Sequence, residues 1–319
     1  MSQQVLKQFN RDVQKYIYPD NSFYKMSIND ASGGATATGM EGTPGKVEIP
    51  QEGLPVEGGK NPESFPLPID QNTDDVKEYP VNWLYTKPRR VADWIDMQTN
   101  YNRRQLSVQS HANKINDMMA IECLEAWVPT KADFILRTSG STTRSGLTKK
   151  TSAGTGTRKQ GKYEDVLKIM ELFGEWDVEM EGRHSLWPSV MLADLYGDLK
   201  SSGAFVAYTD LQNALIKGGR IGKLLTFEVW TRSFAGVYTN DSTPIPKSLS
   251  KFVPAASDNH AALFWQESRV RRYEGTVKFF QTNQSAENQA DLISSGCWSG
   301  GVKSRKDEAG VAALVQAHG

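Results

Sequence analysis

The chain has 319 residues and a mass of 35.5 kDa, enough for one large domain or two ordinary ones with a real hydrophobic core. Its 37 basic and 37 acidic residues leave a formal charge of +0, which argues against a protein that mainly coats nucleic acid, because phosphate neutralisation needs excess lysine and arginine. Two cysteines, no apolar core in the leading MSQQVLKQFN and no long apolar run predict a soluble protein made in a reducing cytoplasm, without disulfides, secretion signal or membrane span.

The first part of the chain combines a short helix with a long polar segment. Apolar residues spaced by three and four predict an amphipathic helix over residues 1–18. Residues 31–65 are rich in Gly, Pro and Thr and cannot fold alone, which indicates an arm or a long loop. The alternating patterns at Lys46–Pro50 and Tyr79–Thr86 predict two strands that pair as a long, exposed hairpin.

Residues 103–127 give the strongest helix prediction in the chain. Apolar residues recur there at spacings of four and three, and neither Gly nor Pro interrupts them. Such a helix is about 37 Å long and would serve as the backbone of a flat subunit. Further helices are predicted from Tyr163, from near Pro188, which suits a first helical turn, and over 210–216.

The rest of the chain reads mainly as β-structure. Leu225, Phe227 and Val229 alternate with other residues as in a strand, and four further segments with strand patterns follow from Ala261 onward. We find no internal repeat. The predicted fold class is therefore α+β with elongated arms.

One segment matches a phosphate-binding pattern. Gly156–Lys162 fits GxxxxGK and precedes a predicted helix. Tyr163 stands where the loop would need a hydroxyl for magnesium, and no apolar strand leads into the pattern. A nucleotide-binding enzyme built on this loop is therefore kept only as an alternative.

Other candidate sites have weaker patterns. The four histidines and two cysteines have no metal-site spacing, so we expect no metal or cofactor. The acids of 175–181 (EWDVEME) could hold a cation or act as an acid–base pair, but we favour a solvated or inter-subunit face with Trp176, Val178 and Met180 turned inward. The basic loop 144–162 could contact nucleic acid, remain solvated or contact a neighbouring subunit.

Three stretches carry a resemblance to a known family. They are VADWID (91–96) before the long helix, EGRHSLWP (181–188) followed by two leucines, and GGRIGKLLTFEV (218–229). Their order resembles the major capsid proteins of tailed double-stranded-DNA phages, which have the Hong Kong 97-type capsid fold, from about residue 45 to the end. Thr226 and Val178-Glu179 depart from the common family pattern.

The resemblance implies a domain organisation. Residues 1–45 would be an N-terminal arm and 46–92 an extended-loop hairpin. The peripheral domain with the long spine helix would span 93–162 and 270–300. The axial domain would span 163–269 and 301–319.

The resemblance also implies a structural function without catalysis. The subunit would self-assemble into hexamers and pentamers of an icosahedral shell, in the virion, after assembly in the host cytoplasm. Its partners would be itself, a portal, scaffolding or decoration proteins, and packaged DNA enclosed without sequence-specific contact. An encapsulin-like nanocompartment shell is the related alternative. The candidate inter-subunit contact residues are Trp83, Leu84, Tyr85, Arg89, Arg90, Arg103 and Arg104.

Overall fold

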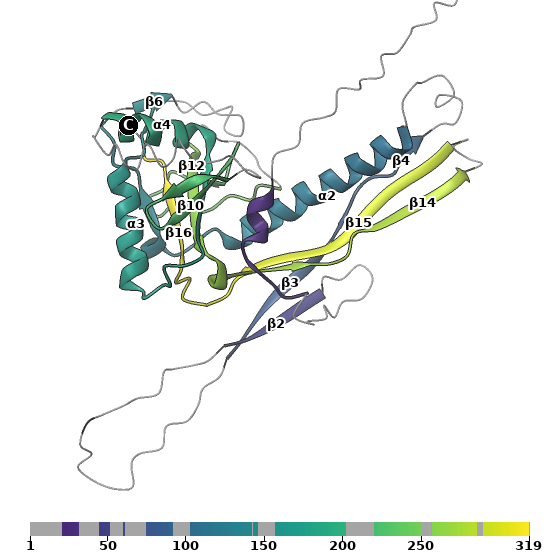
Figure 1. Ribbon diagram of the computed structural model, residues 1–319, viewed down its shortest axis with the longest axis horizontal. Coiled ribbons are helices and arrows are strands. Elements are labelled where there is room, and N and C mark those ends of the chain that lie inside the picture. The colour runs from purple at the N-terminus through teal and green to yellow at the C-terminus, as the bar shows by residue number, and fades with distance from the viewer. Residues whose placement is uncertain are drawn as a thin grey trace, which may run out of the picture.

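A computed structural model describes residues 21–31, 45–51, 60, 75–91, 103–141, 143–145, 157–201, 220–250, 255, 257–285 and 290–318. Figure 1 shows two parts within these residues, an elongated sheet with one long helix along it and a compact body with two helices. The helices expected over 1–18 and 210–216 lie outside the described residues.

The described helices are α2 (Arg103–Trp127), α3 (Tyr163–Glu175) and α4 (Ser189–Ser201), with 3₁₀ helices η1 (Ser22–Lys25), η2 (Ala132–Phe134) and η3 (Glu267–Arg269). The strands are β1 (Ile28–Asn29), β2 (Gly45–Gln51), β3 (Asp75–Tyr85), β4 (Arg89–Val91), β5 (Ile135–Arg137), β6 (Thr143–Ser145), β7 (Thr157–Lys159) and β8 (Arg183–Pro188). They continue with β9 (Arg220–Leu224), β10 (Phe227–Arg232), β11 (Gly236–Tyr238), β12 (Asn259–Gln266), β13 (Val270–Glu274), β14 (Lys278–Ser285), β15 (Ala290–Lys303) and β16 (Val311–Val315).

The elongated sheet is organised around β15. Strands β13 and β14 pair antiparallel with one edge of β15, and β3 and β4 pair antiparallel with its other edge. Strand β2 pairs with β3, as the expected hairpin requires, and β1 adds to β13. Helix α2 lies along this sheet (Figure 1) and comes close to it at Gly301, where a Cβ would approach Cys123 and Ala126 to 3.1 Å.

The second sheet is mixed, with the order β5-β16-β12-β8-β10-β9 and β11 added to β12. Strands β8 and β10 are parallel, whereas β12 is antiparallel to both β8 and β16. All residues of β8, β12 and β16 are buried. Because both faces of these strands are covered, β16 and residues 261–265 of β12 are continuous apolar runs that do not alternate, whereas β8 also buries the polar residues Arg183, His184 and Ser185. Residues of α3 and α4 pack on one face through a cluster that includes Phe173, Leu195, Phe227 and Phe264.

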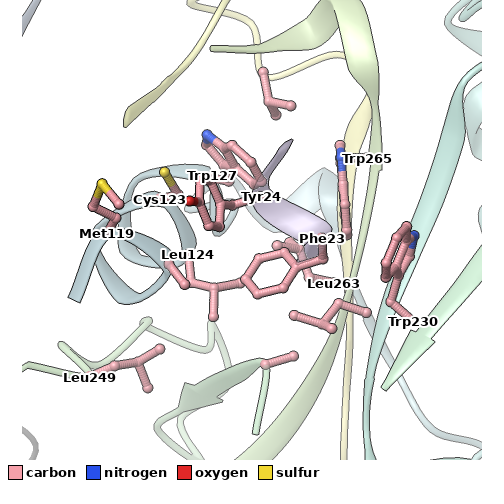
Figure 2. Packing of buried hydrophobic residues seen from close by; sticks show 14 of the residues in the cluster. Phe23, Tyr24, Met119, Cys123, Leu124, Trp127, Trp230, Leu249, Leu263 and Trp265 are labelled. Atoms are coloured by element: carbon pink, nitrogen blue, oxygen red, sulfur yellow. The ribbon is translucent and has the colours of Figure 1, made fainter. Parts of the chain in front are cut away.

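A second cluster joins the two sheets, and we call it the joint cluster. It combines buried residues of η1, α2, β10, β12, β15 and β16. In Figure 2 the Phe23 ring lies between the Leu124 side of α2 and the strand that carries Leu263 and Trp265. The rings of Phe23 and Trp265 are 6.3 Å apart in an edge-on contact, and those of Trp127 and Trp265 are 5.8 Å apart.

Polar contacts fasten the same joint. The indole of Trp265 donates to the Met26 carbonyl at 2.8 Å, and that of Trp127 donates to the Arg271 carbonyl at 3.1 Å. Tryptophan can therefore be buried at this joint without leaving its N–H unpaired. The N-terminal segment 21–31 thus fixes how the helix of one sheet sits on the strands of the other.

Glu308 ties the end of α2 to the turn before β16. Its carboxylate accepts from the Thr130 hydroxyl at 2.7 Å and the Thr130 N–H at 2.9 Å, and it pairs with Lys303 at 2.8 Å. Burial alone would raise the pKa of Glu308, but these donors and the Lys131 N–H outweigh burial and lower it to about 2.

The structure confirms several predicted elements and corrects others. The long helix spans the predicted residues, and the helix expected from Tyr163 begins there. Leu225 is not in a strand: it has φ 54 in the two-residue turn between β9 and β10, because such tight hairpin turns need a positive φ. Pro188 is the last residue of β8, and α4 begins one residue later at Ser189.

Truncating Phe23, whose ring fills the space between α2 and β12 in the joint cluster, should make the protein easier to unfold. Phe23 is 1% exposed, so Phe23→Ala should lower the free energy of unfolding by about 3–5 kcal/mol through lost burial and a cavity. Urea unfolding of the unassembled subunit measures this. The matched control Phe279→Ala removes a half-exposed ring and should cost less than about 1 kcal/mol. Equal losses for both variants would contradict this role for Phe23.

The Glu308 contacts should make stability depend on pH in a defined range. The pKa of Glu308 is lower in the folded chain than its ordinary value of 4.5, so its stabilisation is present above that value and is lost as pH falls toward about 2. Glu308→Gln should therefore be clearly less stable than wild type at pH 7, with the difference shrinking below pH 4.5. Urea midpoints across this range test it, with Glu171→Gln, exposed on α3, as control. A difference that does not change with pH would be inconsistent with these contacts.

Candidate subunit-contact surface

The three apolar contact candidates at the end of β3 do not share one environment. Leu84 faces α2 and is buried in the joint cluster. This burial differs from the expectation that Leu84 contacts a second copy of the chain. Side chains alternate along a strand, which places Trp83 and Tyr85 on the opposite face. The Tyr85 side chain is 65% exposed, whereas Trp83 is half-buried.

Trp83 belongs to a row of aromatic rings on the outer face of the elongated sheet. Its ring centre is 5.3 Å from that of Trp298 and 6.5 Å from that of Phe280. The indole lies over Gly296, where any Cβ would overlap it. We call Trp83, Tyr85, Phe280 and Trp298 the outer aromatic face. It spans β3, β15 and β14.

The arginine candidates lie near the same end of the molecule. Arg89 and Arg90 are exposed on β4, which pairs with the N-terminal half of β15. Arg104 forms an ion pair of 2.6 Å with Asp291 of its own chain, which differs from the expected pairing with a second copy. Arg103 begins α2, and its side chain lies outside the described residues.

The base of the β2–β3 hairpin is anchored on its own chain. Val47, Ile49, Tyr79 and Val81 form a buried cluster with Val302. The Tyr79 hydroxyl donates to Asp30 at 2.6 Å, and burial together with Asp30 raises the pKa of Tyr79. The described part of the hairpin, residues 45–51 and 75–85, is therefore anchored on its own chain.

The acidic segment after α3 is a turn with exposed apolar residues. Val178 is buried as expected, but Trp176 is 44% and Met180 75% exposed, so the inward orientation expected for them was wrong. The segment is a turn with Asp177 at φ 50, so strand alternation does not apply. The buried Arg183 side chain holds it by donating to the Glu179 carbonyl at 2.8 Å and the Val178 carbonyl at 2.5 Å.

The contacts at the start of α3 argue against the alternative that Gly156–Lys162 binds a phosphate. Asp165 accepts from the Lys162 N–H at 3.0 Å and from the Ser139 N–H at 3.1 Å, and Asp198 accepts from the Tyr163 N–H at 2.8 Å. Carboxylates therefore already bind the helix N–H groups that a phosphate would need, and they would repel its charge. Gly156 lies outside the described residues.

The described histidines, cysteines and acidic residues bear on whether the chain has a metal site or a reactive thiol. No cluster of three or more His, Cys, Asp or Glu side chains among these described residues is suited to a metal ion. Cys123 and Cys297 are buried, and burial raises the pKa of both, to about 12 for Cys297. None of the described helices has the length and apolar character needed to cross a bilayer.

Comparison with known proteins assigns the fold. No family model and no curated protein matches the sequence. Among solved structures, the chain is similar to the capsid of cyanophage P-SCSP1u, at 15% identity and TM-score 0.63, over 98% of this chain and 92% of that one. It is similar to the capsid of Ralstonia phage GP4 at 12% identity and TM-score 0.64, over 99% and 96%. It is also similar to the capsid of cyanophage Pam1, at 11% identity and TM-score 0.61, over 97% of this chain and 95% of that one.

These likenesses cover nearly the whole chain and not a single motif. The α+β chain therefore has the capsid fold of tailed phages, as the resemblance to the Hong Kong 97-type family implied.

Two glycine substitutions should have opposite effects on stability. Gly296→Ala places a methyl group against the Trp83 indole and should cost about 1–3 kcal/mol. Gly197→Ala, where a Cβ meets nothing within 4 Å on α4, should add roughly 0.5–1 kcal/mol because alanine favours the helix. Thermal unfolding of both variants measures the signs. A neutral Gly296→Ala would mean that Trp83 does not lie across β15.

Proposed function

We propose that this chain is a major capsid subunit that assembles into hexamers and pentamers of an icosahedral shell around packaged double-stranded DNA. The observation that carries the proposal is the likeness to phage capsids over 97–99% of the chain, which includes the elongated sheet as well as the compact body. One matched structure is described as the capsid of a native GTA particle computed with C5 symmetry, which fits a subunit able to form five-fold rings. The function is structural, without catalysis.

The subunit contacts would involve the exposed side chains near the end of β3 and on β4. Tyr85 and the outer aromatic face supply apolar area, and Arg89 and Arg90 supply charges for acids of a neighbouring copy. Arg103 is kept as a further candidate. Each exposed ion pair contributes at most about 1 kcal/mol, so register and closure depend on repeating the same contacts by symmetry.

The charge balance suits a wall that encloses DNA without binding a particular sequence. The formal charge is +0, so the chain as a whole does not attract phosphate. The proposed location is the virion, with assembly in the host cytoplasm and with portal and scaffolding or decoration proteins as partners. The arm, extended loop, peripheral and axial domains with the boundaries given above belong to the same proposal.

Electron microscopy and sedimentation of the full-length protein, expressed alone and with its neighbouring genes, test the proposal. We expect closed shells or rings of five and six subunits, with nuclease-protected DNA in particles formed together with a portal. Shells that enclose a cargo protein and no DNA would favour the nanocompartment alternative. A protein that stays monomeric at millimolar concentration under both conditions would refute shell formation.

Charge reversal on β4 should weaken assembly without affecting the fold. The double variant Arg89→Glu/Arg90→Glu loses two exposed pairs of about 1 kcal/mol or less each, which should raise the concentration needed for assembly roughly tenfold. Light scattering at increasing protein concentration measures this threshold. Added salt screens the charges and should bring the assembly thresholds of the variant and the wild type closer together.

The matched control Lys168→Glu/Lys223→Glu changes the charge by the same amount at exposed positions of α3 and β9. It should assemble like wild type, and all variants should keep the wild-type melting temperature. Equal loss of assembly in both double variants would show a general effect of charge and not a contact at β4.

A further inference from the structure

The edges of the two sheets differ in how well they are protected from pairing with other strands. Most described edge strands, such as β1, β4, β5 and β11, have two or three residues. Strand β2 carries Pro50 and the exposed charges of Lys46 and Glu48, and β9 carries Arg220 and Lys223. Short length, proline and charge are the features that keep sheet edges from associating.

Strand β14 is long, has no proline and carries a single charge at one end. It spans eight residues, Lys278–Ser285, and its sequence KFFQTNQS contains one charge and no proline. Residues 278–283 are all exposed, with Phe279 at 47% and Phe280 at 52%. Its only described strand partner is β15, and Figure 1 shows it as the outer strand, at the end of the elongated sheet away from α3 and α4.

We propose that the open edge of β14 is a contact between two copies of this chain, in which the two β14 strands pair antiparallel across a two-fold axis. An open edge presents unpaired backbone N–H and C=O groups, and only an extended strand satisfies them along its length. This inference rests on the proposed function for the supply of second copies, but it names a contact that shell formation alone does not require.

The charge pattern of β14 favours its own copy as the occupant. The single charge, Lys278, lies at one end of the strand. Antiparallel pairing places it opposite uncharged residues of the mate, whereas parallel pairing would bring the two lysines together. A two-fold contact is self-complementary, so one uncharged edge suffices for both partners.

The ladder between β14 and β15 sets the centre of the contact. Regular pairing runs over Lys278–Thr282, and a bulge interrupts it before Ser285. A two-fold axis at the middle of the regular part places Phe280 opposite Phe280 of the mate, and Lys278 opposite Thr282. The ring of Phe280 already rests against Trp83 at 6.5 Å, so the outer aromatic faces of the two copies would join into one.

Cross-linking of the full-length protein tests this geometry. In the paired strands two copies of Gln281 would lie diagonally across the axis, about 8 Å apart. Gln281 is exposed, and the native Cys123 and Cys297 are buried, so Gln281→Cys supplies one reactive thiol per chain. A bis-maleimide of matching length should convert most chains to covalent dimers with no higher ladder, because a two-fold contact closes after two copies.

The matched control is Glu48→Cys, an equally exposed thiol on the opposite edge of the same sheet, which should give at least tenfold less dimer. Adding Phe280→Lys to Gln281→Cys places like charges on the axis and should lower the dimer yield at least tenfold. Ile245→Lys changes an exposed apolar residue in the turn after β11 and should leave the yield unchanged. Melting temperatures of the unassembled variants confirm that each one folds.

The possible results distinguish failure of the proposed β14 contact from failure of the proposed shell assembly. Particles with covalent dimers support both proposals. Particles without dimers overturn the β14 contact alone, and they would point to another occupant such as residues 1–20 of a neighbouring copy. Dimers in a protein that never forms particles keep the contact and overturn the shell. A ladder of higher species would show a head-to-tail contact and overturn the two-fold arrangement.

Discussion

The whole architecture depends on burying three aromatic rings where the two sheets meet. Phe23, Trp127 and Trp265 come from η1, α2 and β12, and each ring covers apolar area of the other two elements. Because aromatic side chains bury the most area per residue, this joint fixes the angle between the elongated sheet and the compact body. The packing at this joint therefore sets where the exposed surfaces at the far end of the elongated sheet lie relative to the body.

The same constraint explains why the elongated sheet has one buried apolar face and one exposed apolar face. On β15 and β3, Cys297 and Leu84 face α2 and are buried, whereas Trp298 and Trp83 lie on the outer face. With a helix on one side only, a twisted sheet this long leaves its other face to solvent or to another molecule. A capsid fold uses such faces, since a shell subunit must be stable before assembly and still have area to bury afterwards.

The elements with a strong period could be predicted from the sequence. The helix 103–127 is marked by apolar residues every three or four positions, and β12 and β16 by continuous apolar runs. The sequence-based predictions were wrong where a turn interrupts the expected alternation of buried and exposed residues. Trp176 and Met180 fit an inward-facing strand pattern, but the left-handed residue Asp177 turns the chain and exposes both side chains. No local pattern distinguishes Leu84 from its neighbour Tyr85 as the residue that a distant helix covers, so the contact surface could be predicted only in part.

The place of β16 in the second sheet has a consequence for biosynthesis. This strand lies between β5 and β12, so residues near position 313 complete a sheet whose other strands begin almost 180 positions earlier in the chain. A nascent polypeptide cannot form the two hydrogen-bond ladders of β16, with β5 and with β12, until the ribosome has passed residue 315, and contacts this distant in sequence form slowly. Prematurely terminated chains would lack this strand and would leave β5 and one edge of β12 unpaired, which exposes them to the cell's chaperones and proteases.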